Sequence, residues 1–371
     1  MKKLLILSLF LILASCAEKP QKELKTRNCK NVIFMIGDGM GTGHISATRI
    51  ATVGPDSALT MDTMPYTGFV KTHSANRLIT DSAASGTAMS TGYKTDNGVI
   101  GLTPNGTRVK NIVKACQEIN MATGLVATSS ITHATPASMA THVESRNQQN
   151  EIARQLIENK VDVLLGGGLG FFLPQSHPLS KRTDDLDILS TAKESGYDIA
   201  QTREELLNSQ AKKLLGLFGP VSMKTTEPEP SLADMTEKAL KILSGRKTGF
   251  FLMVEGSQID WGAHDNDFQE VLRQTRLFDE AIAVALDFAK KDKHTLVIVT
   301  SDHETGGLAV NKGDRDGKNL VAGWTSGSHT AEMVPLFAYG PGGQRFVGLF
   351  DNTKIPQKFA QLIDLKDFPQ E

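Results

Sequence analysis

The chain has 371 residues, of which 40% are hydrophobic and 22% are charged, and its formal net charge is −1. These proportions are typical of a soluble globular protein with a large core, built from between about one and three domains. The balanced charge and the lack of a dense run of Lys or Arg argue against a nucleic-acid-binding surface.

Residues 1–16 have the pattern of a bacterial export signal. Two lysines precede an apolar run from Leu4 to Leu13, which is too short to span a bilayer as a mature helix. The run ends in Leu-Ala-Ser-Cys16, which resembles the lipobox of lipoproteins, although ordinary signal cleavage nearby is the alternative. We therefore expect an exported, periplasmic protein that a lipid on Cys16 anchors to a bacterial membrane, with residues 17–30 as a polar tether.

Two cysteines remain after Cys16, namely Cys29 and Cys116. In an oxidising compartment they either form one disulfide or stay free, and the sequence does not decide between these outcomes. With only three cysteines in the chain, a thiolate metal site is not expected.

Several short apolar runs, most of them followed by glycine or polar residues, predict buried strands. They lie at 31–36, 123–129, 161–165, 250–255, 295–300 and 334–339, and residues 66–72 also alternate like a strand. The spacing of apolar residues predicts a helix over 109–119, and small residues favour another from Ser82 to Met89. From about 171 to 230 we expect variable loops and short helices.

Ser82 lies where a predicted strand gives way to a predicted helix, in the stretch Thr80-Asp81-Ser82. Free backbone N–H groups and the positive end of the helix dipole favour an anion at this point. The ordinary alternative is that Asp81 or Ser82 simply caps the helix. Serine is a weak nucleophile, so catalysis requires a base or a metal from elsewhere in the chain.

Further polar side chains follow the predicted strands. Each has an ordinary structural explanation, but the carboxyl ends of parallel strands are where α/β folds bind ligands. Mixed carboxylate and imidazole ligands suit zinc, whereas carboxylates with a hydroxyl suit magnesium. Arg146 is expected on the helix that follows Pro136, either solvated or directed at a phosphate. The candidates are Asp38, Thr135, Glu255, Asp302 and His303, with Asp260, His264 and His329 nearby.

Six stretches in one order resemble the metal-dependent bacterial alkaline phosphatases. They are NVIFMIGDGMG, TDSAASGTAMSTGYKTDNGVIG, THATPASMATHVESR, FFLMVEGSQIDWGAH, VIVTSDHETGG and SGSHTAEMVPLFAYGPG, which together extend from residue 31 to residue 343. The resemblance implies a three-layer α/β/α sandwich with a central, mostly parallel sheet, and one domain over 31–371. It further implies hydrolysis of small phosphate monoesters through a phosphoserine, and a homodimer.

The resemblance also assigns roles by position. Ser82 would be the nucleophile, Arg146 would bind the phosphate, and Asp81 would hold the arginine. The cofactors would be two Zn²⁺ and one Mg²⁺ per chain: one zinc on Asp260, His264 and His329, the other on Asp38, Asp302 and His303, and magnesium on Asp38, Thr135 and Glu255.

Two positions depart from the best-known pattern of the family. His133 stands where some members have an aspartate near the magnesium, and Trp261 stands where others have lysine or histidine near the phosphate. These changes leave the expected ligands intact, but they put the affinity and identity of the third metal in question, since histidine suits zinc. The alternatives are a phosphodiesterase, sulfatase or mutase on a similar scaffold, or a binding protein without turnover.

Overall fold

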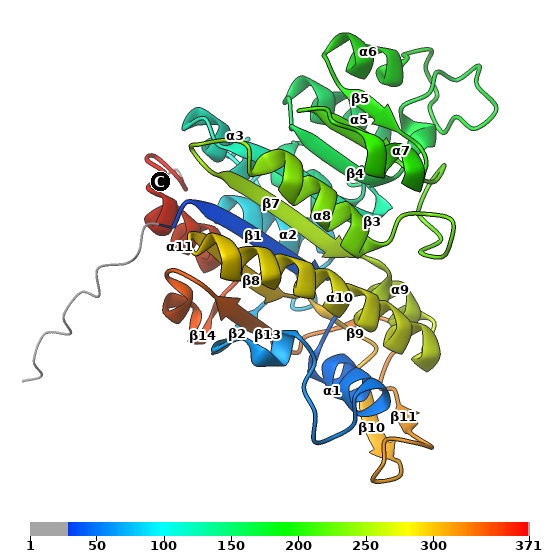
Figure 1. Cartoon of the computed structure of the whole chain (residues 1–371), viewed down its shortest axis with the longest axis vertical. Helices are drawn as coiled ribbons and strands as arrows, with labels where there is room; N and C mark the ends of the chain where they lie inside the picture. The colour runs from blue at the N-terminus through cyan, green and yellow to red at the C-terminus, as the bar shows by residue number, and fades with distance from the viewer. Residues whose placement is uncertain (1–28, 370–371) are drawn as a thin grey trace, which may run out of the picture.

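The computed structural model describes residues 29–369 (Figure 1). The predicted signal and tether residues 1–28 lie outside the described residues. Cys29 and Lys30 belong to the folded domain rather than to the predicted tether, because Cys29 is buried and the Lys30 N–H donates to the carbonyl of His294 at 2.9 Å. Cys29 and Cys116 are both buried free thiols.

A ten-stranded sheet runs through the centre of the molecule, and β13 is its one antiparallel strand. The predicted strands are all present, with bounds that differ by a few residues at most. In spatial order the strands are β14 (Gly348–Asp351), β2 (Tyr66–Lys71), β13 (Val334–Tyr339), β8 (Thr295–Thr300), β1 (Asn31–Gly37), β7 (Phe250–Gly256), β3 (Ala122–Ser130), β4 (Val163–Gly167), β6 (Leu214–Leu217) and β5 (Asp198–Ala200).

Helices cover both faces of this sheet, which confirms the predicted three-layer fold (Figure 1). Along β1, Val32, Phe34 and Ile36 pack into one apolar cluster and Ile33 and Met35 into the other, because successive strand residues point to opposite faces. The first cluster includes residues of α2 (Ser82–Thr91), α3 (Ile112–Glu118), α4 (Ala134–Ala140), α5 (Gln149–Glu158), α6 (Ile188–Glu194) and α11 (Lys354–Ile363). The second includes residues of α7 (Arg203–Asn208), α8 (Leu232–Leu243) and α10 (Phe268–Asp292).

Smaller elements extend past the carboxyl ends of the strands. Helices α1 (Thr42–Thr52) and α9 (Gln258–His264) pack beside α10 and the hairpin of β10 (Ala309–Lys312) and β11 (Val321–Gly323). Two short strands, β9 (Glu304–Thr305) and β12 (His329–Thr330), pair with each other. The remaining elements are the 3₁₀ turns η1 (Met61–Thr63), η2 (Leu169–Phe171) and η3 (Gly343–Phe346).

Residues 171–230 differ from the expectation of loops and short helices. They contribute β5 and β6, which form one end of the central sheet. These strands have only three and four residues, too few to show a clear hydrophobic period. Within residues 29–369, no helix is both long and apolar enough to cross a membrane.

Candidate active site

The side chains predicted to form the site lie at the carboxyl ends of four adjacent strands. Asp38 follows β1, and Asp302 follows β8 on one side of it. Glu255 ends β7 on the other side, where it pairs in register with Ile36, and Thr135 lies in α4 after the next strand, β3. The parallel register therefore brings together residues that are hundreds of positions apart.

Asp38, Asp302 and His303 form a fully buried group, which we call the buried triad. The Nε2 atom of His303 lies 3.5 Å from Oδ1 of Asp38 and 3.3 Å from Oδ2 of Asp302. The other Asp302 oxygen accepts hydrogen bonds from the N–H groups of Gly39 and His303, which orient the carboxylate. Gly39 has a φ of +70°, and a Cβ there would lie 2.7 Å from the Thr305 hydroxyl, so this turn requires glycine.

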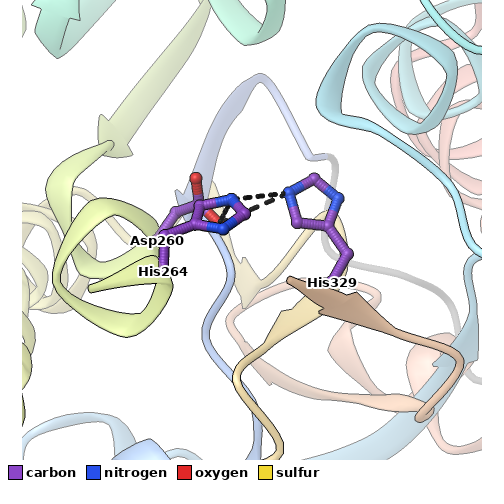
Figure 2. A group of neighbouring side chains, drawn as sticks. All are labelled: Asp260, His264 and His329. Atoms are coloured by element: carbon purple, nitrogen blue, oxygen red, sulfur yellow. Dashed lines mark hydrogen bonds and ion pairs between the residues drawn. The ribbon is translucent and has the colours of Figure 1, made fainter. Parts of the chain in front are cut away.

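Asp260, His264 and His329 form a second group, the open triad (Figure 2). Asp260 and His264 are four residues apart on α9 and therefore share one face of it, as the sequence predicted. Nε2 of His264 lies 3.4 Å from Oδ1 of Asp260 and 3.1 Å from Nε2 of His329, which comes from β12. In each histidine the Nδ1 atom faces a backbone carbonyl, which leaves Nε2 directed into the group.

A third group consists of Asp38, His133 and Glu255, whose candidate ligand atoms lie within 4.8 Å of one another. The buried hydroxyl of Thr135, predicted as a magnesium ligand, has no hydrogen-bond partner among the described residues. Ser257 and Ser129 donate to Oε2 of Glu255 at 2.6 and 3.3 Å, and so hold that carboxylate in place.

The electrostatics of these groups fit bound cations. Both oxygens of Asp38, Oδ2 of Asp302 and Oε1 of Glu255 are buried and have no hydrogen-bond partner among residues 29–369. Burial, followed by repulsion from Asp302, raises the pKa of Asp38 well above its usual value, and burial raises the pKa of Asp302 and brings that of Glu255 to about 7. Clustered buried carboxylates of this kind are stable in ionised form when metal ions balance their charge.

The imidazole of His303 is equally suited to metal binding. Burial, and secondly the charge of His329, lower the pKa of His303 well below its usual value. The ring therefore stays neutral, which is the form that ligates a metal. The rings of His303 and His329 stack with centroids 3.6 Å apart, so the buried and open triads adjoin each other.

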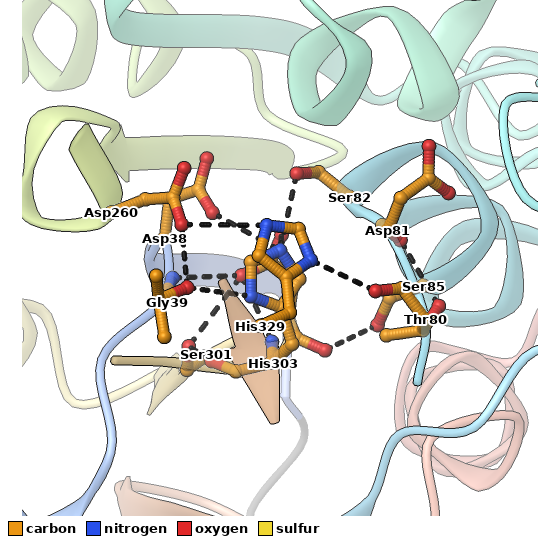
Figure 3. Close-up of polar contacts among 12 residues, drawn as sticks. Asp38, Gly39, Thr80, Asp81, Ser82, Ser85, Asp260, Ser301, His303 and His329 are labelled. Carbon is orange, nitrogen blue, oxygen red and sulfur yellow. Dashed lines mark hydrogen bonds and ion pairs between the residues drawn. The ribbon is translucent and has the colours of Figure 1, made fainter. Parts of the chain in front are cut away.

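Ser82 is the first residue of α2 and lies beside the buried triad (Figure 3). Its Oγ atom is 3.3 Å from Nε2 of His303, and its side chain is buried. The capping alternative applies to its neighbour, because Asp81 is the N-cap and its Oδ1 accepts from the N–H of Ala84 at 3.0 Å. Ser82 thus keeps its hydroxyl free of capping and directs it toward the ligand atoms.

Arg146 was expected on the helix after Pro136, and this expectation is wrong. Helix α4 ends at Ala140, and Val143 instead pairs with Ile100 through two backbone hydrogen bonds of 3.0 Å. The Arg146 N–H continues this pairing by donating to the Gly98 carbonyl at 2.7 Å. A nonlocal strand-like pairing has overridden the helical tendency of the segment.

This pairing places the Arg146 guanidinium beside Asp81. Nη1 of Arg146 donates to Oδ2 of Asp81 at 3.0 Å, and the same carboxylate oxygen accepts from the Gly98 N–H. Asp81 therefore caps α2 with one oxygen and orients Arg146 with the other.

His133 and Trp261, the two departures from the family pattern, lie together. Their rings meet edge to face with centroids 6.2 Å apart, and Nε2 of His133 is 3.3 Å from Nη2 of Arg146. Burial, and secondly the charge of Arg146, lower the pKa of His133 to about 3. A neutral imidazole at this position is able to supply nitrogen to the third group.

The sequence analysis missed the side chains that orient the ligands. Thr305 donates to Oδ1 of Asp260 at 2.5 Å, and Ser85 donates to the Asp302 carbonyl at 2.7 Å while accepting from Asn352. A Ser or Thr beside a ligand carries no signal of its own in one sequence. Only Ser85 could have been suspected, because it lies three residues after Ser82 and so on the same face of the predicted helix.

The fold and these clusters define a metal-binding α/β enzyme whose buried serine adjoins the ligand groups. Residues 29–319 match the family model for alkaline phosphatase. The chain is 37% identical to alkaline phosphatase 4 of Bacillus subtilis, covering 87% of this chain and 86% of the relative, and 31% identical to alkaline phosphatase of Escherichia coli, covering 92% and 88%. The solved structure of alkaline phosphatase from the Antarctic bacterium TAB5 superimposes with a TM-score of 0.84 at 37% identity, covering 92% of this chain and all of the other.

The chain therefore belongs to the alkaline phosphatase family. It is a metal-dependent hydrolase of phosphate monoesters, which confirms the resemblance drawn from its sequence motifs.

Proposed function

We propose that this chain hydrolyses phosphate monoesters through a phosphoserine on Ser82. The observation that carries the proposal is the position of Ser82 Oγ, 3.3 Å from Nε2 of His303 and next to carboxylate oxygens that have no hydrogen-bond partner among the described residues. A buried serine at a helix N-terminus, beside a site built for cations, has the surroundings that favour its ionised form.

We assign two Zn²⁺ and one Mg²⁺ to the three groups. The buried triad and the open triad each combine carboxylate oxygen with imidazole nitrogen, which suits zinc. Asp38, Thr135 and Glu255 offer oxygens only, which suits magnesium, while His133 makes zinc the competing ion there. When bound, these cations lower the pKa of the serine hydroxyl and of water and neutralise charge on the attacking and leaving oxygens.

In the first half of the reaction, Ser82 gives up its hydroxyl proton to solvent and its Oγ attacks phosphorus. The P–O bond to the alcohol breaks, and the alcohol oxygen leaves with the electron pair and is protonated. In the second half, water attacks the phosphoserine from the opposite side. The P–Oγ bond breaks, Ser82 regains a proton, and inorganic phosphate is released.

Arg146 binds two non-bridging phosphate oxygens in this scheme. Its guanidinium is 23% exposed and is held at one edge by Asp81, which leaves its remaining N–H groups available to a ligand. His133 contacts the other end of the Arg146 guanidinium, and Trp261 packs against His133, so that these two rings shape how water reaches the phosphate.

The test combines metal content with trapping of the intermediate. We expect the purified protein to hold about two zinc ions and one magnesium, to hydrolyse p-nitrophenyl phosphate, and to form an acid-stable phosphoserine when mixed with labelled phosphate. Ser82→Ala should lose the phosphoserine and turnover but keep its metals. A phosphorylated intermediate in Ser82→Ala would refute the nucleophile, and full activity without metals would refute the metal assignment.

The remaining proposals concern the whole protein. We propose that residues 1–15 are removed during export, that Cys16 becomes the first mature residue and carries the lipid anchor in the periplasm, and that the residues that follow it up to 28 are the tether. We also propose one catalytic domain from residue 29 onward with 171–230 as its most variable part, and a homodimer. Mass spectrometry of the exported protein tests the lipid on Cys16, and sedimentation equilibrium tests the dimer.

A further inference from the structure

The amino ends of the strands form the edge of the sheet opposite the active site (Figure 1). Five of these strands, β8, β1, β7, β4 and β6, each have a lysine within three residues before their start. Parallel register aligns the starts, since Asn31 lies beside Thr295 and Val163 beside Leu214. We call this row the basic edge; in spatial order it consists of Lys293, Lys30, Lys247, Lys160 and Lys213.

The basic edge is broad. From β8 to β6 the sheet spans about 24 Å, given the usual spacing of neighbouring strands. At one end, Lys160 and Lys213 line a cavity of about 700 Å³ together with Arg246, which pairs with Asp162 at 3.5 Å, and with Glu158. Further cations next to the row are Arg108, Lys114, Lys212, Lys290 and Lys291.

Three acidic groups at this edge have partners within the protein. Asp162 accepts from the Thr123 N–H at 2.9 Å, Asp292 accepts from the Thr295 hydroxyl at 2.6 Å, and Glu158 pairs with Arg154. By contrast, the exposed Lys30, Lys160, Lys247 and Lys293 make no ion pair with any residue in 29–369. Four lysines in this row are therefore exposed and without a carboxylate partner among the described residues.

Helix dipoles explain only part of this arrangement. The C-terminus of α10 lies at this edge, and cations such as Lys290 and Lys291 are favourable in its last turn. Lys30 and Lys213 directly precede strands and belong to no helix. Lys213 lies over the Tyr197 ring at 5.2 Å, but neither helix dipoles nor this contact accounts for the whole row, which is available to an external anionic partner.

The path of the chain indicates which partner. The described chain begins at this edge with Cys29, and the twelve residues 17–28 separate it from Cys16. Those residues reach at most about 40 Å when extended and average about 20 Å as a flexible coil. They also carry four cations against two acids, Glu18 and Glu23. An anchor on Cys16 would hold the basic edge against the membrane surface.

We propose that the basic edge docks on the anionic phospholipid headgroups of that membrane and leaves the active site facing away from the lipid. The orientation of the protein on the membrane rests on the proposed lipid anchor on Cys16. The attraction of the basic edge to anionic lipid does not depend on that anchor. A basic surface adds to a lipid anchor as a second membrane signal.

The experiment uses the chain from residue 17, which keeps every described residue and lacks Cys16. It is sedimented with vesicles of equal parts phosphatidylglycerol and phosphatidylcholine, or of phosphatidylcholine alone. We expect binding to the anionic vesicles only, weakened by salt. The triple variant Lys30→Gln, Lys160→Gln, Lys247→Gln should bind roughly 100-fold more weakly, at about fivefold per lysine.

The matched control is Lys71→Gln, Lys224→Gln, Lys312→Gln, which removes three exposed lysines outside this edge and should change binding by less than about twofold. Hydrolysis of p-nitrophenyl phosphate should be equal in all three proteins, so that failure of the phosphatase assignment is recognised separately. Equal vesicle binding by wild type and the first variant, binding to neutral vesicles, or tighter binding to duplex DNA than to anionic vesicles would overturn the proposal.

Discussion

The two triads differ most in how far water reaches them. The side chains of Asp38, Asp302 and His303 are fully buried, whereas those of His264 and His329 are 36% and 15% exposed. The buried triad is built from the ends of central strands, while the open triad joins a short helix to a two-residue strand. Buried carboxylates stay ionised only when a bound cation balances their charge. An exposed ligand set can release its cation to solvent and bind it again.

The largest effect is expected at the buried triad. Asp302→Asn should reduce turnover by more than about 10³-fold, because loss of a single group that stabilises transition-state charge already costs that much. Added zinc should not restore activity, since no outside ligand reaches this position. Kinetics with metal analysis measure both effects.

The matched control for that variant is Asp185→Asn, an exposed aspartate in the segment 171–230, which should retain full activity. Near-normal turnover in Asp302→Asn would show that the buried triad is not part of the catalytic machinery.

A smaller and reversible effect is expected at the open triad. His264→Ala should weaken zinc affinity by at least about 100-fold, because removing even a partner of a ligand costs 10–100-fold. Since this position is exposed, water replaces the imidazole, and excess zinc should restore much of the activity. Titration of activity against free zinc measures the shift. If no concentration of zinc restores the activity of His264→Ala, the open triad does not exchange its cation more readily than the buried triad.

A further effect is expected at Arg146, which lies beside Asp81 and His133. Arg146→Ala should weaken inhibition by inorganic phosphate roughly 100-fold, because two charge-assisted hydrogen bonds are lost, while metal content stays unchanged. Arg154→Ala, on the exposed side of α5, is the control and should leave inhibition unaltered. Equal inhibition constants in wild type and Arg146→Ala would contradict the role of this residue.

The smallest effect concerns the stability of metal-free protein. Burial raises the pKa of Glu255 from 4.5 to about 7, so the folded state binds this proton more tightly than the unfolded state does. The stability contributed by this proton is fully present below pH 4.5 and is lost as the pH rises through 7. Thermal unfolding after chelation should therefore show a falling Tm over that range.

Glu255→Gln should reduce this dependence, to which Asp38 and Asp302 contribute with the same sign, and the metal-loaded enzyme should lack it, because the bound cations replace the protons. A Tm of the chelated protein that rises between pH 4.5 and 7 would show that other groups dominate.

Local patterns were enough to find seven of the ten strands of the central sheet, whereas most helices, including the long α10, were not predicted. The strand from 295 to 300 and the strand from 334 to 339 have the predicted bounds. A short apolar run bounded by polar or turn-forming residues is typical of a buried strand, so its ends can be read from the sequence. Strands β5, β6 and β14 were missed because three or four residues carry no reliable period. The position of Arg146 was missed because its backbone partners, at 98–100, are distant in sequence.

The sequence by itself determined the chemistry of this protein. Asp and His side chains next to strand ends indicated a metal site, and the resemblance of six ordered stretches to alkaline phosphatases implied the hydrolase. The tertiary structure alone decided which ligand set is buried, how Asp81 aligns Arg146, and that scattered lysines meet on one edge. These properties depend on strand order and register, which join residues that no local pattern connects.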